Sequence, residues 1–188
     1  MPQRRLGREP RDEAKRYFDT WTGTSAERAE AFRRQVAAAG GPGPDVLDGT
    51  PASLVPAWTW LREHAETVDE LPDDPDLPEW AEPGRAPRGF ELSPATLRLL
   101  DGFIHYYAQV LLADVPGTRW EFYEDRRRGD VNVDHQWPVL VGERIHVNPM
   151  VVAGLTYRAV ADPDGIEPER ILRVYASQTG QPELVAGR

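Results

Sequence analysis

Residues 93–112, SPATLRLLDGFIHYYAQVLL, decide the fold of this chain. Ser93 followed by Pro94 is a typical helix start, because serine caps free backbone N–H groups and proline fits the first helical position. Apolar side chains then cover most of the circumference of the predicted helix. A helix that is apolar nearly all round belongs in the middle of a core. We therefore predict a central helix that ends near Leu112.

Four further segments have apolar residues at helical spacing together with a residue that typically begins or ends a helix. They are residues 12–40 with a break at 22–25, residues 53–64, and two shorter segments that begin at Asn148 and at Pro168. We expect these helices to surround the central one.

Residues 119–147 have the alternation typical of strands. Trp120 and Phe122 alternate with polar residues, and the valines of the segment 131–133 do the same. The segments 138–141 and 144–147 flank Gly142-Glu143, which is a plausible tight turn. The chain is therefore predicted to have an α+β fold, with several helices packed on a small antiparallel β-meander.

The length of 188 residues favours one domain with short tails. We expect a disordered basic N-terminus at 1–10, a single domain at 11–178 and a frayed tail at 179–188. Within the domain, residues 66–92 form a long acidic, proline-rich connection. A connection of this length is unusual inside a compact domain, so we interpret it as a mobile loop that Trp80 anchors.

Composition excludes several classes of protein. The chain has no cysteine, so it has no disulfide scaffold, no thiolate metal site and no cysteine nucleophile. Hydrophobic residues make up 40% and charged residues 28%, which is typical of a soluble globular protein. No apolar run approaches the roughly 18 residues that span a bilayer, and the charged N-terminus is unlike a signal peptide. We expect a cytoplasmic protein without a membrane partner.

The charge of the chain is uneven. The net charge is −9; residues 1–38 carry nine basic and six acidic side chains, whereas residues 39–188 carry thirteen basic and twenty-five acidic ones. Such a surface repels a phosphate backbone, so nucleic acid is an unlikely partner for the folded part. A basic protein partner, attracted by the acidic stretch at 66–92, fits this charge better.

Four residues are candidates for metal binding or acid–base chemistry. They are His105, Asp134, His135 and His146. If the central helix packs on the predicted sheet, these side chains converge into a site with two or three ligands. The commoner alternative for a histidine on a core helix is burial with ordinary hydrogen bonds, and it stays open here.

Other catalytic patterns are incomplete. The spacing Asp130-x-Asn132-x-Asp134 is similar to the start of a calcium loop, but His135 and Val141 stand where that loop needs glycine and glutamate. We therefore interpret the segment as a half-exposed strand. Neighbouring carboxylates leave glycoside hydrolysis open. The sequence contains no nucleophile-elbow, dinucleotide-binding or P-loop motif, and no cofactor is predicted.

Aromatic residues are the remaining signal. Tryptophan and tyrosine dominate the hot spots of protein interfaces, so an exposed one is a candidate anchor for a partner. The candidates are Trp60, Trp80, Tyr106 and Trp137. The alternative is that they fill gaps between the helices and the sheet.

About half of the chain resembles a known arrangement. The part from Phe103 to Val151 contains YYAQVLL, RWEF, WPVL and IHVNPMVV, and the part from Gly40 to Trp58 contains GGP, LD, SL and W. This layout resembles small uncharacterised bacterial proteins, actinobacterial ones among them, with a Y-x-G-E-V helix before a meander containing W, P-x-L and V-x-P. Ala108-Gln109 stands where Gly-Glu is usual. The resemblance implies no activity; by analogy it points to immunity or accessory partners of bacterial toxins.

Two hypotheses follow from the sequence. The first is a non-catalytic protein-binding module, such as an immunity, adaptor or regulatory partner. The second is a small enzyme or metal-binding protein that uses the histidine and aspartate candidates above. We prefer the first, because no catalytic motif is present and the chain is acidic and rich in tryptophan.

Overall fold

The computed structural model describes residues 9–81, 89–125 and 134–186. Helices and two small antiparallel sheets make up this part of the chain, which confirms the predicted α+β fold. The elements in chain order are α1 (Arg11–Ala38), a short 3₁₀ helix (Pro51–Ser53), α2 (Leu54–Glu63), β1 (Thr67–Val68), β2 (Glu91–Leu92), α3 (Pro94–Asp114), β3 (Arg119–Phe122), β4 (Pro138–Val141), β5 (His146–Val147), α4 (Val151–Ala161), α5 (Arg170–Thr179) and a second 3₁₀ helix (Pro182–Leu184).

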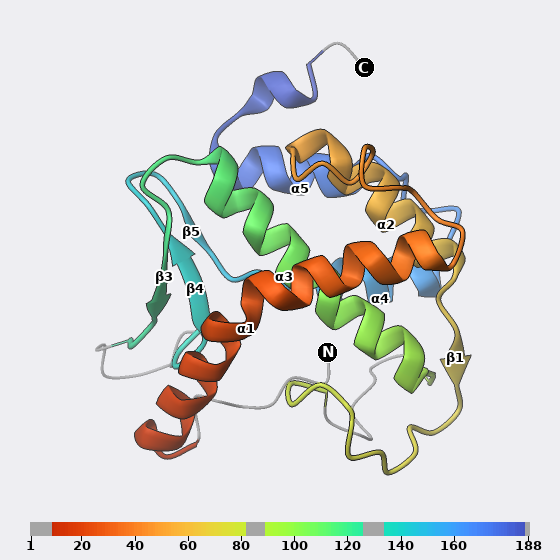
Figure 1. The fold of residues 1–188 in the computed structure, drawn as a ribbon, viewed down its shortest axis with the longest axis horizontal. Helices are drawn as coiled ribbons and strands as arrows, with labels where there is room; N and C mark the ends of the chain where they lie inside the picture. Colours follow the sequence, from red (N-terminus) through yellow and green to blue (C-terminus); the bar gives the residue numbers. More distant parts are fainter. Residues whose placement is uncertain (1–8, 82–88, 126–133, 187–188) are drawn as a thin grey trace.

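Helix α3 is the central helix that the sequence predicts. The Ser93 hydroxyl accepts a hydrogen bond from the Thr96 backbone N–H at 3.2 Å, so the predicted cap forms. Figure 1 shows α3 running through the middle of the molecule, with α1 crossing it. The crossing is close because a side-chain carbon at Gly102 would lie only 2.8 Å from Cβ of Phe32. Glycine thus lets the two longest helices meet.

The predicted break in the first helix is wrong, because α1 is continuous from Arg11 to Ala38. Its threonines bond backward along the helix: Thr22 Oγ1 donates to Phe18 O at 2.9 Å, and Thr24 Oγ1 donates to Thr20 O at 2.8 Å. Such bonds satisfy the hydroxyl groups within the helix, slightly destabilise it and often bend it. Figure 1 shows that α1 changes direction along its length.

The larger sheet has the order β3-β4-β5 and is antiparallel throughout. Trp120 of β3 lies opposite Leu140 of β4, and Val141 lies opposite His146 of β5. Because Gly142 N donates to Ile145 O at 3.0 Å, the tight turn is centred one residue later than predicted. The predicted strand at 131–133 lies outside the described residues.

The acidic connection is fixed at more than one point in its described parts, 66–81 and 89–92. Trp80 is the predicted anchor, and its Nε1 donates to Asp101 Oδ1 of α3 at 2.8 Å. Asp74 also pairs with Arg98 of α3 at 2.9 Å, and β1 pairs with β2 where the connection begins and ends. The expectation of a loop with a single anchor is therefore wrong.

The C-terminal segment is folded as far as the structure describes it, so the expectation of a frayed tail from 179 is wrong. Gln181 Nε2 donates to Asp114 Oδ2 at 3.1 Å, and Leu184 packs against the hydrophobic core. Gly180 ends α5 with a φ of 68°, a conformation that glycine adopts without strain. In the described part of the chain, no helix has both the length and the hydrophobicity needed to cross a membrane.

Candidate protein-binding groove

His105 is sealed inside the core on α3. Its exposed fraction is 0%, and its ring lies against Trp21 of α1 with centroids 4.3 Å apart. Among the described residues, neither ring nitrogen has a hydrogen-bond partner, and the carboxylate oxygen Asp101 Oδ2 lies 4.0 Å from Nε2. Burial, reinforced by the charge of Arg28, lowers the pKa of His105 to about 3. The imidazole is therefore neutral at ordinary pH and takes part in packing.

The other candidate ligands do not join His105. His146 Nε2 lies 3.8 Å from Asp134 Oδ2, and Asn148 Nδ2 donates to the second oxygen of Asp134 at 2.8 Å. His135 is engaged elsewhere, since its Nδ1 accepts from the Asp125 backbone N–H at 2.9 Å.

The predicted convergence of the four candidates is therefore wrong. Among them, only Asp134 and His146 come within ion-pair distance. The described residues contain no group of three histidine, aspartate or glutamate side chains arranged to hold a metal ion. The reason is topological, because the central helix presents His105 to α1 rather than to the edge of the sheet where the other three lie. Asp130 and Asn132 lie outside the described residues.

The expectation of an exposed aromatic anchor is also wrong, since all four candidates are buried. Trp80 bonds to Asp101 as described above. The Tyr106 hydroxyl lies 2.6 Å from Ser53 Oγ and accepts from the Gly49 backbone N–H at 3.1 Å. The ring of Trp137 packs edge-on against a tyrosine of α1. Trp60 is 8% exposed.

The surface feature that sequence analysis missed is a groove beside α2. It consists of three hollows, which we call the first, middle and last sections of the α2 groove. The first and middle sections share Thr59 and Glu63, and the middle and last sections share Glu167. Because neighbouring sections have lining residues in common, the three hollows adjoin one another, and we describe them together as one groove.

The middle section lies between the end of α2 and the connection from α4 to α5. Its volume is about 530 Å³. Val160 from α4 and Ile166 and Pro168 from the connection contribute apolar surface, and all three are half-buried or exposed. Apolar surface gathered in a concave place is more informative than apolar residues scattered singly.

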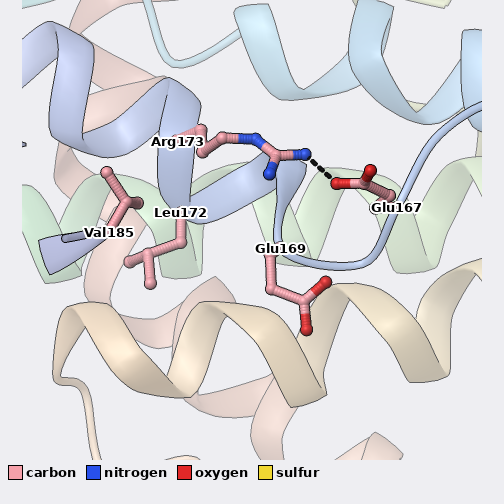
Figure 2. A pocket seen from close by; sticks show the side chains of 5 residues that line it. All are labelled: Glu167, Glu169, Leu172, Arg173 and Val185. Carbon is pink, nitrogen blue, oxygen red and sulfur yellow. Dashed lines mark hydrogen bonds and ion pairs between the residues drawn. The ribbon is translucent and has the colours of Figure 1, made fainter. Parts of the chain in front are cut away.

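The first section has a volume of about 390 Å³, and its lining includes Pro42, Val55, Pro56 and Trp60. The last section has a volume of about 370 Å³ and is shown in Figure 2. Val185 is its half-buried apolar wall, the buried Leu172 lies beneath it, and Glu169 stands at its border.

The positive charges of the groove are engaged within the protein. Arg62 Nη2 donates to Pro163 O at 3.0 Å, and the guanidinium carbon lies 4.7 Å from the ring centre of Trp58. Partial burial lowers the pKa of Arg62 from its usual value. Arg173 pairs with Glu167, as Figure 2 shows, and this hydrogen bond lowers the pKa of Glu167.

Three acidic side chains of the groove have no such partner. Glu63, Asp164 and Glu169 make no hydrogen bond or ion pair with any described residue. The groove therefore combines apolar walls with carboxylates whose charge is not balanced locally. No pattern in the sequence indicates this surface, because its walls come from segments that are separate along the chain. The one local hint of an apolar contact there is Ile166, a single apolar residue in the acidic, proline-containing run DPDGIEPER.

Comparison with known proteins adds no relative: no protein-family model, no curated protein and no solved structure is significantly similar to this chain. A functional inference therefore depends on the geometry and charge described above.

Proposed function

We propose that this protein is a non-catalytic protein-binding module, and that a positively charged, partly apolar segment of another protein docks in the α2 groove. The observation that carries the proposal is the combination of Val160, Ile166 and Pro168 along the groove with the unbalanced carboxylates of Glu63 and Glu169. Apolar contacts supply affinity, while the carboxylates steer a basic partner and disfavour an acidic one.

The charge of the whole molecule supports the same partner. The net charge is −9, and the acidic connection adds further carboxylates to the field that an approaching basic segment meets. An immunity, adaptor or regulatory partner in a bacterial cytoplasm fits this description, and we retain these roles as part of the proposal.

The alternative proposal, a small enzyme or metal-binding protein, has less support. Its four candidate residues do not converge, and His105 is neutral and sealed in the core. The pair Asp134 and His146 remains together at the edge of the sheet, but without a third group that could hold a metal among the described residues.

The test uses the full-length protein labelled with ¹⁵N and synthetic probe peptides of equal length. Two basic probes contain lysine and leucine, one of them with prolines and the other with alanines that favour a helix; two counterparts have glutamate in place of lysine. We expect at least one basic probe to shift the backbone amide signals of Val160, Ile166 and Glu169, and the glutamate counterparts to leave them in place. A set of groove signals that no basic probe moves would contradict the proposal.

A matched pair of charge reversals separates docking from general attraction. Glu63→Lys changes the groove, whereas Glu70→Lys makes the same change on the exposed acidic connection. Exposed ion pairs contribute about 1 kcal/mol at most, so Glu63→Lys should weaken binding of the basic probe about fivefold. If both reversals weaken binding of the basic probe equally, the probe responds only to the net charge of the protein, and the proposal is wrong.

A further inference from the structure

Glu167 lies at the junction between the middle and last sections of the α2 groove. Both linings contain it, and its neighbours in the chain, Ile166 and Pro168, line the middle section. The Glu167 side chain is exposed, so another molecule can reach its carboxylate. Lysine and arginine side chains pack their apolar stems on apolar surface and keep the charged head in water. Such a side chain can therefore contact Ile166 or Pro168 and place its charge beside Glu167.

Glu167 already has a cationic partner within the protein. Arg173 Nη2 of α5 donates to Glu167 Oε2, and Figure 2 shows the guanidinium pointing toward this carboxylate, whereas Glu169 points away from the pair. This hydrogen bond is the main reason why the pKa of Glu167 lies below its usual value. Arg173 thus occupies the carboxylate that a cation of a docked segment would meet at the junction.

The ion pair between Arg173 and Glu167 is of a kind that exchanges readily. The two side chains are 42% and 66% exposed, and exposed pairs contribute little to stability because water solvates both charges well. Among the described residues, Glu167 is the one hydrogen-bond partner of the Arg173 guanidinium. Once apolar contacts hold a segment in the groove, its cation competes with Arg173 at a high effective concentration. One ion pair then replaces another, and water solvates the released Arg173.

We infer that a lysine or arginine of the docked segment pairs with Glu167 and displaces Arg173, which occupies this carboxylate while the groove is free. This inference rests on the proposed function, because it names the position at which the groove receives a cation of its partner. Arg173 is then an internal competitor that lowers the affinity of the groove for basic segments.

The test compares two substitutions on α5 that change the net charge equally. Arg173→Gln removes the competitor. Arg170→Gln removes an exposed arginine that lies outside the groove linings and acts on Glu167 only through its charge. The full-length proteins are titrated at physiological ionic strength with the basic probe that binds the wild type more tightly. From the range measured for exposed ion pairs, Arg173→Gln should tighten binding about two- to fivefold, and Arg170→Gln should tighten it less than about twofold.

Two further measurements separate displacement from a general effect of charge. Glu167→Gln removes the shared carboxylate, so adding Arg173→Gln to this variant should tighten binding no more than adding Arg170→Gln does. In the wild type, ¹⁵Nε relaxation follows the motion of the Arg173 side chain. The bound basic probe should make this side chain more mobile, and the glutamate counterpart should leave its motion unchanged.

The outcomes distinguish this inference from the proposed function. Equal tightening by the two arginine substitutions, or an Arg173 side chain whose motion the bound basic probe does not change, would overturn the inference and leave the docking proposal standing. Groove amides that no basic probe moves would contradict the proposed function itself. Groove signals that depend on protein concentration alone would identify a second copy of this chain as the occupant and overturn both. If Arg173→Gln does not fold, the relaxation measurement on the wild type still decides.

Discussion

Replacing His105 with phenylalanine is expected to make the protein more resistant to acid. The wild-type imidazole is fully buried, lies against Trp21 and makes no hydrogen bond to a residue that the structure describes. Phenylalanine therefore keeps the ring contact and leaves none of these residues without a polar partner. Swaps of similar volume in a core usually change stability by less than about 1.5 kcal/mol. At pH 7 the variant should therefore have a free energy of unfolding close to that of the wild type.

The difference appears on acidification. The pKa of His105 is lowered by burial to about 3 in the folded protein, against an ordinary value of 6.5. Between pH 6.5 and about 3, His105 therefore binds a proton in the unfolded chain but not in the folded one. The stability that neutral His105 allows above pH 6.5 is lost as the pH falls toward 3. One pKa unit corresponds to about 1.4 kcal/mol. At pH 4.5, which is two units below 6.5, His105 should therefore lower the free energy of unfolding of the wild type by about 2.7 kcal/mol.

The carboxylate of Asp101, 4.0 Å from His105 Nε2, is present in both proteins. Burial raises the pKa of Asp101, and the groups that lower it again are Arg28 and Trp80, not His105. Its contribution should therefore largely cancel when the variant is compared with the wild type.

Urea unfolding followed by tryptophan fluorescence at pH 7 and pH 4.5 measures this difference. The free energy of unfolding of the wild type should fall by about 2.5 kcal/mol more than that of His105→Phe, and the His105 ring signals in NMR spectra should not titrate over this range. Parallel losses in both proteins, or an imidazole that titrates near pH 6 while the protein is folded, would refute the argument that His105 is neutral in the core.

Two further predictions concern packing and the acidic connection. Gly102→Ala should destabilise the protein by about 1–3 kcal/mol, because the added carbon would lie 2.8 Å from Cβ of Phe32. Gly23→Ala should instead stabilise α1 by about 0.5–1 kcal/mol, because no heavy atom lies within 4 Å of the added carbon. Urea unfolding measures both changes in stability. Trp80→Phe removes the hydrogen bond to Asp101 and should cost about 1–3 kcal/mol in the same assay, while amide exchange in residues 69–81 becomes faster; unchanged exchange would show that other contacts hold this segment.

The elements that the sequence predicted best are those specified by neighbouring residues. Helix α3 begins at Pro94 with its serine cap because the cap and the apolar pattern are both local. The break expected at 22–25 is absent although the threonine hydroxyls bond to carbonyls of the preceding turn, bonds that slightly destabilise and often bend a helix. The packing of α1 on α3 across Gly102 adds a tertiary stabilisation that local propensity does not include.

The candidate site was less predictable, since it depends on which faces of distant segments meet. Placing His105 with Asp134 required knowing that α3 turns that residue toward Trp21, and nothing in the sequence around His105 specifies this. The same limit applies to the α2 groove. Val55 and Val160 belong to different helices and Val185 to the segment after α5, and only their arrangement in space brings them to neighbouring parts of the groove.

Polar groups that bond within the core differ in role from polar groups that line the groove. Buried polar groups such as Asp101 and the Tyr106 hydroxyl have partners inside the protein, and these bonds fix how the connecting segments join α3. The Glu63 and Glu169 carboxylates lie along a groove and have no partner among the described residues. Unsatisfied hydrogen-bonding capacity costs little where water can reach it and becomes available when a partner displaces that water. In the described part of the chain, the groove beside α2 is therefore a surface where charged groups without a partner lie beside apolar side chains and can bind another protein.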